Sequence, residues 1–162
     1  RASYADELQD LAASLGIANR VIWTGPYPAE SDVASLYLRA SDIGVLPIDI
    51  GVQLNNSSFA AVATHGLPIV ATRGNTPEAP FVDGENLLWC RPKDPQSMAL
   101  AITRLIEDPL LRERLQLGVL KLADDWFSWD RATARTIAML RPHNGDSASC
   151  GRNENRDATM PR

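Results

Sequence analysis

The sequence predicts an α/β domain in which a parallel sheet is covered by helices on both faces. Short apolar runs rich in β-branched residues alternate, along the first 90 residues, with stretches whose apolar residues recur at helical spacing. Gly and Pro residues stand between these stretches, where they end strands and helices. This alternation is typical of parallel sheets, because a crossover helix returns the chain to the same end of the sheet.

The chain is expected to open with a helix and a buried strand. Ser3 has the side chain of an N-cap, and Asp6 and Glu7 follow in the first turn, where carboxylates stabilise the positive end of a helix. Apolar residues then recur at helical spacing up to Gly16. Residues 21–24 are apolar and rich in strand-forming side chains, and we expect them to form a buried strand that ends at Gly25.

Further along, strands and helices are expected to alternate. A helix is predicted over residues 30–39, with Val33, Leu36 and Tyr37 on one face, and a short helix over residues 58–65. The expected strands are residues 43–47, 68–72 and 86–90. A polar loop, residues 49–56, connects the first of these strands to the short helix.

The last third of the chain is predicted to be helical. Asp94–Pro95 and Asp108–Pro109 each combine an N-cap residue with proline in the first turn. The inward side chains are expected to be Met98, Ile102, Leu105, Ile106, Leu111, Leu115 and Leu122. Trp126 and Trp129 flank a break before a terminal helix at residues 131–140, and packing is the expected role of both rings.

Composition limits the domain organisation and the function classes. Residues 1–141 have the composition of one globular domain, whereas residues 142–162 are polar and are predicted to be disordered. The net charge of −4 argues against binding nucleic acid or an anionic membrane. No apolar run approaches the roughly 20 residues of a membrane span. The two cysteines are far apart, so we expect no disulfide and a cytoplasmic location.

The loop after the predicted strand at 43–47 is the main candidate binding site. Ligands of open α/β sheets bind beyond the carboxyl ends of the strands, where loops meet helix N-termini. Backbone amides, hydroxyls and a positive helix end suit an anion such as a diphosphate. The candidate residues of this loop are Gly51, Gln53, Asn55, Asn56, Ser57 and Ser58. The alternative is that Ser57 or Ser58 only caps the helix.

Several short motifs, taken together, resemble the C-terminal domain of group 1 (family 4) glycosyltransferases. These motifs are "RVIWTGPYP", "LYLRASDIGVLPI", "HGLPIVAT", the Pro-Glu turn at Pro77–Glu78 and "DGENLL". Their order and spacing cover residues 1–140. The resemblance implies a Rossmann-like domain, the donor-binding half of a GT-B fold. It further implies that two opening strands, with an Arg and a Lys for the diphosphate, precede Arg1.

The sequence departs from the family at two positions. Many members carry two glutamates eight positions apart, of which the second holds the donor ribose. Gln53 and Ala61 stand at those positions here. The chain therefore resembles a variant branch in which a serine-capped helix replaces the glutamate pair.

The resemblance implies transfer of a sugar from a nucleotide diphosphate to an acceptor hydroxyl, with retention and without a metal or cofactor. Glu78 is then a candidate contact to the sugar or ribose, with a turn role as the alternative, and Tyr27 is a candidate for the base pocket. No catalytic residue can be assigned. We expect the acceptor, a glycan, lipid or small molecule, to bind a preceding domain, so that this chain alone would be inactive.

Two other functions are compatible with the same residues. A degenerate nucleotide-binding or structural module would explain the absence of both glutamates. An epimerase that shares the GT-B architecture is the second alternative, which His65 alone supports poorly. Saturable binding of a nucleotide sugar would separate the first alternative from a transferase.

Overall fold

A computed structural model describes residues 3–28 and 30–140 and contains the predicted parallel sheet. Its strands β1 (Gly44–Leu46), β2 (Ile69–Thr72) and β3 (Leu88–Cys90) lie in the order β1-β2-β3. Val45 pairs with Val70, and Thr72 pairs with Cys90, so the three carboxyl ends meet at one edge. The predicted strands at 43–47, 68–72 and 86–90 are therefore confirmed. The predicted disordered tail, residues 142–162, lies outside the described residues.

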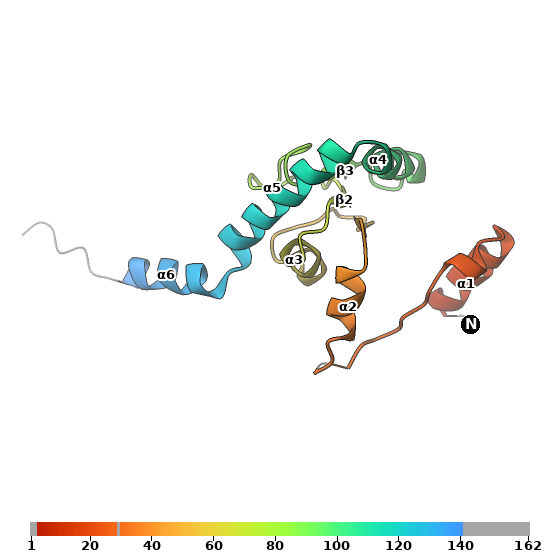
Figure 1. The fold of residues 1–162 in the computed structure, drawn as a ribbon, viewed down its shortest axis with the longest axis horizontal. Coiled ribbons are helices and arrows are strands. Elements are labelled where there is room, and N and C mark those ends of the chain that lie inside the picture. Colours follow the sequence, from red (N-terminus) through yellow and green to blue (C-terminus); the bar gives the residue numbers. More distant parts are fainter. Residues whose placement is uncertain (1–2, 29, 141–162) are drawn as a thin grey trace, which may run out of the picture.

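The helices follow one another along the chain in the predicted order, and α1 and α6 extend away from the sheet on opposite sides (Figure 1). They are α1 (Tyr4–Ser14), the short 3₁₀ helix η1 (Ala18–Arg20), α2 (Val33–Arg39), α3 (Ser57–Thr64), α4 (Pro95–Glu107), α5 (Pro109–Phe127) and α6 (Trp129–Leu140). α3 packs on α5, whereas α4 packs on β2 and β3. This arrangement is the α/β class that the sequence predicts.

Two apolar clusters show that both faces of the sheet are covered. Ile69 and Ala71 of β2 belong to a cluster with the buried side chains of α3 and the second half of α5. Val70, between them, belongs to a second cluster with Leu105 of α4 and the first turns of α5. Successive side chains of a strand point to opposite faces, so a strand buried on both sides has four buried residues in a row, as β2 does.

Cys90 belongs to the second cluster and is a small buried side chain of the core. Burial raises the pKa of its thiol.

Helix starts follow the capping residues closely. Ser3 and Asp6 form a capping box, and Asp94 accepts a hydrogen bond from the backbone of Ser97 at 2.8 Å. Asp108 ends α4 and begins α5, and its carboxylate accepts from the Leu111 amide at 2.9 Å. One side chain thus fixes the turn between two long helices.

Replacing Asp108 with alanine is therefore expected to lower the free energy of unfolding by about 1 kcal/mol, because the Leu111 amide loses its acceptor. Urea unfolding followed by circular dichroism would measure the change. Asp10→Ala, at an exposed position within α1, is the matched control and should change stability by less than about 0.5 kcal/mol. Equal losses in the two variants would contradict this role of Asp108.

The predicted buried strand at residues 21–24 is wrong for this structure. These residues form neither helix nor strand, and Ile22 and Trp23 are 73% and 46% exposed. A strand requires a neighbour for its backbone N–H and C=O groups, and this segment runs apart from β1 toward α1 (Figure 1). α1 itself packs on η1.

The apolar faces of the outer helices are also more exposed than the sequence predicts. Val33, Leu36 and Tyr37 of α2 are exposed, as is Ile106 of α4. Helical spacing identifies a common face but not the element that covers it, and for α2 the described residues provide no strand there. In contrast, the predicted inward residues of α5 are all buried.

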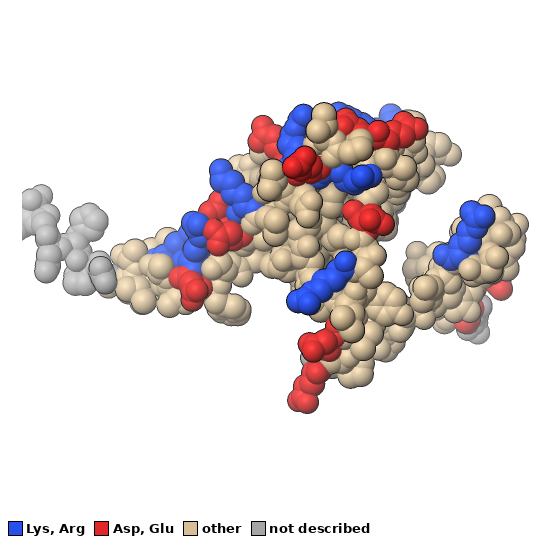
Figure 2. All heavy atoms as spheres, in the orientation of Figure 1, with Lys and Arg blue, Asp and Glu red and all other residues tan. Residues whose placement is uncertain are grey.

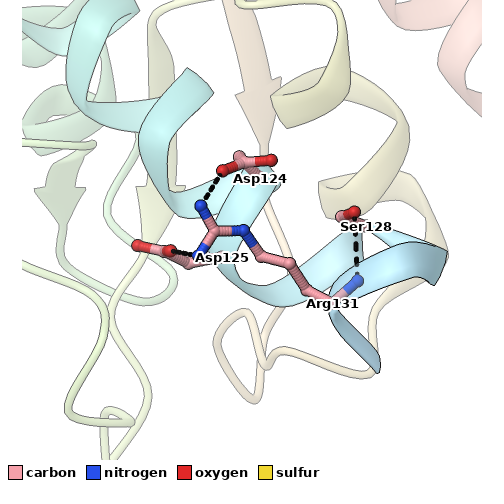
Figure 3. A network of polar contacts seen from close by, with 4 residues as sticks. All are labelled: Asp124, Asp125, Ser128 and Arg131. Carbon is pink, nitrogen blue, oxygen red and sulfur yellow. Dashed lines mark hydrogen bonds and ion pairs between the residues drawn. The ribbon is translucent and has the colours of Figure 1, made fainter. Parts of the chain in front are cut away.

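The predicted break between the last two helices lies at Ser128, where α5 ends and α6 begins (Figure 3). Arg131 extends back across the break and pairs with Asp124 at 2.5 Å and Asp125 at 3.0 Å. Trp126 packs under the guanidinium of Arg135, but Trp129 is 85% exposed. The expected packing role is thus wrong for Trp129 in the described part of the chain, where α6 contacts α5 and no other element is placed over this side.

Charged side chains of both signs are mixed on the face shown in Figure 2. This face therefore presents no large surface of a single sign. Within the described residues, no helix is long and apolar enough to span a membrane.

Candidate functional site

Two loops meet at the carboxyl edge of the sheet, after β1 and after β2. The Val52 amide of the first loop donates to the carbonyl of Thr72 at 3.3 Å. Gly51 has a φ of +87°, and a Cβ there would collide with the backbone of Gly74 in the second loop. Gly51 is thus required both by its left-handed backbone and by the close approach of the loops. Its amide donates to Ile48, so its contribution to a binding site is conformational.

Glu78 fixes the first loop from the second. Its carboxylate accepts a hydrogen bond from the backbone amide of Leu54 at 2.5 Å, across 24 residues of sequence. Glu78 is half-buried in this position. The predicted turn role and the predicted ligand role are both compatible with this geometry, since only one carboxylate oxygen contacts Leu54.

The start of α3 presents two backbone amides to solvent. Asn56 is its N-cap, and its side chain accepts from the Phe59 amide at 2.8 Å. The Ala60 amide donates to the Asn56 carbonyl. Of the first four amides of α3, those of Ser57 and Ser58 therefore have no acceptor among the described residues. Both serines are exposed, so their hydroxyls are accessible as well.

The cap is not the serine that the sequence suggests. Asn56 has the extended backbone of an N-cap, with φ −79° and ψ 113°, whereas Ser57 and Ser58 already lie inside the helix. Asparagine and serine are equally good caps, so the sequence could not distinguish them. With Asn56 as the cap, the first two amides of the helix are those of Ser57 and Ser58.

The remaining predicted site residues lie in two separate places. Gln53 and Asn55 are exposed in the first loop. Tyr27 packs against Tyr37 of α2, with ring centroids 6.0 Å apart, and so lies with the N-terminal segment. The described contacts do not join Tyr27 to the two loops.

His65 lies at the opposite end of α3. Its Nδ1 contacts the carbonyl of Ala61 at 2.7 Å, and its Nε2 contacts the hydroxyl of Ser35 at 2.7 Å. Because a carbonyl only accepts, Nδ1 donates to Ala61, and the Ser35 hydroxyl can pair with Nε2 as donor or acceptor. His65 thus joins α3 to α2, as expected for a structural rather than a catalytic residue.

Two groups that join the loops, Gly74 and the Leu54 amide, are not identified by the sequence alone. The Arg73–Gly74–Asn75 turn carries a glycine, but no local signal shows that it meets Gly51. No side-chain pattern marks a backbone amide either. Within the described residues, no group of three or more His, Cys, Asp or Glu side chains could hold a metal ion.

Comparison with known proteins identifies the family. The family profile described as "Glycosyl transferases group 1" matches residues 2–108, more than half of the chain. The chain belongs to the group 1 glycosyltransferases. This confirms the resemblance that its short motifs indicate.

Relatives of this group 1 domain include curated enzymes of bacteria. The D-inositol 3-phosphate glycosyltransferase of Thermomonospora curvata is 33% identical over 136 residues, which are 82% of this chain and 30% of the relative. The MMP alpha-(1->4)-mannosyltransferase of Mycolicibacterium hassiacum is 28% identical over 143 residues, 88% of this chain and 34% of the relative. The chain thus spans about a third of the length of the curated relatives it matches.

Solved structures show the same fold. Anabaena HepE in complex with UDP has a TM-score of 0.69 at 23% identity, over 85% of this chain and 37% of that one. The C-terminal domain of a group 1 family glycosyl transferase from Francisella tularensis has a TM-score of 0.66 at 22% identity, over 78% and 63%. The group 1 domain described here therefore has the fold of a GT-B C-terminal domain.

The structure locates the two positions at which many group 1 members carry glutamate and this chain does not. Gln53 lies in the loop before α3, and Ala61 is exposed on the helix itself. A methyl group at position 61 cannot accept a hydrogen bond from a ribose hydroxyl. The polar groups at the start of α3 therefore remain as the candidate contacts to a donor.

Proposed function

We propose that this domain binds the nucleotide-diphosphate sugar of a glycosyltransferase and that the glycosyl group passes to an acceptor hydroxyl with retention. The observation that carries the proposal is the pair of unpaired amides at Ser57 and Ser58. They lie at the N-terminus of α3 and at the carboxyl edge of the sheet, where an anion is stabilised by both the amides and the helix dipole. The solved structure of HepE, which has this fold, contains UDP.

The amides fit the charge that develops in such a reaction. As the bond between the sugar and the diphosphate breaks, the leaving oxygen takes the electron pair. The acceptor oxygen forms the new bond to the sugar, and its proton passes to the leaving diphosphate. Donors that are already positioned stabilise the leaving diphosphate without reorganisation. Asn56 and Glu78 supply that positioning, through the amides of Phe59 and Leu54. We propose no metal or other cofactor for this step.

The other predicted residues complete the proposed donor site. Gln53 and Asn55 lie in the same loop and can donate amide N–H groups to phosphate or sugar oxygens. Glu78 can accept from a sugar or ribose hydroxyl with the oxygen that does not contact Leu54. Tyr27 remains the proposed contact to the base. We propose that the acceptor binds outside this chain, so the 162 residues alone bind donor without transferring sugar.

A non-catalytic nucleotide-binding or structural module is the second candidate, and Ala61 favours it. Titration calorimetry of the full-length protein with UDP-glucose, GDP-mannose and ADP-glucose would separate the two. Saturable binding of one of them supports the donor site, whereas no saturable binding of any would favour a structural module.

A double variant, Ser57→Asp with Ser58→Asp, tests the location of the donor. Two carboxylates at the start of α3 repel a diphosphate and compete for the same amides, so affinity is expected to fall about tenfold or more. Thr133→Asp with Ala134→Asp adds the same charge on exposed α6 and should leave binding unchanged. Undiminished binding by the serine double variant would show that the donor binds elsewhere.

A further inference from the structure

Basic residues line a cleft at the carboxyl ends of β2 and β3, next to the start of α4. The cleft consists of two cavities of about 390 and 230 Å³ that have Arg91 as a common wall. Arg73 lines the first cavity and Lys93 lines the second. Residues 51–58, which contain the proposed donor-binding side chains, line neither of them, although Asp49 at the start of the same loop lines the second.

The sheet register brings the two arginines together. Thr72 and Cys90 are paired residues of β2 and β3, and the arginines are the next residue on each strand. The Arg73 amide also donates to the Cys90 carbonyl at 2.9 Å. Neighbouring strands are roughly 5 Å apart, so two guanidinium groups start from adjacent backbone positions. Like charges in adjacent positions repel one another unless an anion lies between them.

The carboxylates of the cleft do not balance its positive charges. Asp94 pairs with Arg91 at 2.7 Å, and its other oxygen accepts from the Ser97 amide. Among the ion pairs of the described residues, Arg73 and Lys93 take no part. Asp49 is the one further carboxylate among the residues that line the two cavities. An excess of positive charge therefore remains at the cleft.

Lys93 has a backbone conformation that a lysine rarely adopts. Its φ is +55°, and it is the only residue other than glycine with positive φ in the described part of the chain. Glycine would fit this left-handed turn without strain. A strained backbone that places a lysine at the wall of a basic cleft favours a role for its ammonium group there.

We propose that this cleft is a second anion site, which binds a phosphomonoester separately from the donor diphosphate. The guanidinium groups of Arg73 and Arg91 can each present two N–H groups to phosphate oxygens, and Lys93 adds a point charge. The cavity volumes suit a small phosphorylated molecule. Binding there also relieves the repulsion between the two arginines.

The Lys93→Gly variant separates binding from folding. It removes the ammonium group and relaxes the left-handed backbone, so the melting temperature is expected to stay the same or rise. Affinity for glucose 6-phosphate and for inorganic phosphate, measured by calorimetry on the 162-residue chain, should fall about tenfold because one charged contact is lost. Arg73→Gln should weaken binding by a similar factor, whereas Arg114→Gln, on the exposed side of α5, should have no effect.

Competition distinguishes the cleft from the donor loop. The double variant Ser57→Asp with Ser58→Asp should keep its phosphate affinity, and saturating UDP should not displace glucose 6-phosphate. Glucose itself, which lacks the phosphate, should not bind at the cleft. Displacement by UDP, or unchanged phosphate affinity in both Lys93→Gly and Arg73→Gln, would overturn the proposal, while donor binding could still be confirmed at α3.

Discussion

Replacing Gly51 with alanine is expected to lower the free energy of unfolding by about 3 kcal/mol. Roughly 1–2 kcal/mol comes from placing a side chain in the left-handed region. A further 1–3 kcal/mol comes from overpacking, because the new Cβ collides with the backbone of Gly74. The two loops must then separate, so we expect nucleotide-sugar binding to be lost together with stability. Urea unfolding and donor titration on the same sample would measure both effects.

Gly84→Ala is the matched control for this prediction. Gly84 has a similar φ of +73°, but no heavy atom lies within 4 Å of the position of its Cβ. It therefore shares the conformational cost and lacks the collision, and we expect a loss of about 1 kcal/mol. Equal losses in the two variants would mean that the contact between the loops contributes nothing to stability.

The sequence predicts elements whose signals are local. Asp94–Pro95 and Asp108–Pro109 mark the starts of α4 and α5 because the cap and the proline act within one helical turn. The three strands of the sheet are short apolar runs between Gly, Pro and Asn residues, and all three are confirmed. Leu111, Leu115 and Leu122 are buried as predicted, because α5 lies against both clusters of the core.

Sequence patterns fail where the outcome depends on a distant partner. Residues 21–24 have the composition of a strand, but strand formation requires a neighbour, and they lie apart from β1. Val33 and Leu36 share a face of α2 that nothing in the described part of the chain covers. The same limit applies at the site, since the pairs Gly51–Gly74 and Leu54–Glu78 join residues more than 20 positions apart. The position of the loop was predictable, whereas its internal contacts were not.

The phenylalanine at the third position of α3 connects the core to the proposed donor site. Phe59 is fully buried, and its ring packs edge-on against Phe81 at 4.9 Å and Phe127 at 6.1 Å between centroids. Phe81 follows the loop that carries Glu78, and Phe127 ends α5. One ring thus holds together the start of α3, the second loop and the longest helix, while its amide donates to Asn56.

Replacing Phe59 with alanine is therefore expected to lower the free energy of unfolding by about 4 kcal/mol, as expected for a large cavity in a core. This loss is a large part of the total free energy of unfolding of a domain, which is roughly 5–15 kcal/mol. Part of the population should therefore unfold at 37 °C. Phe59→Leu fills most of the space and is expected to cost less than about 1.5 kcal/mol. Since the leucine variant keeps the backbone amides of α3, it should retain donor binding. If Phe59→Leu loses donor binding while its melting temperature stays near that of the unmodified chain, the position of α3 is not set by packing alone. In that case the aromatic ring itself is required at the site.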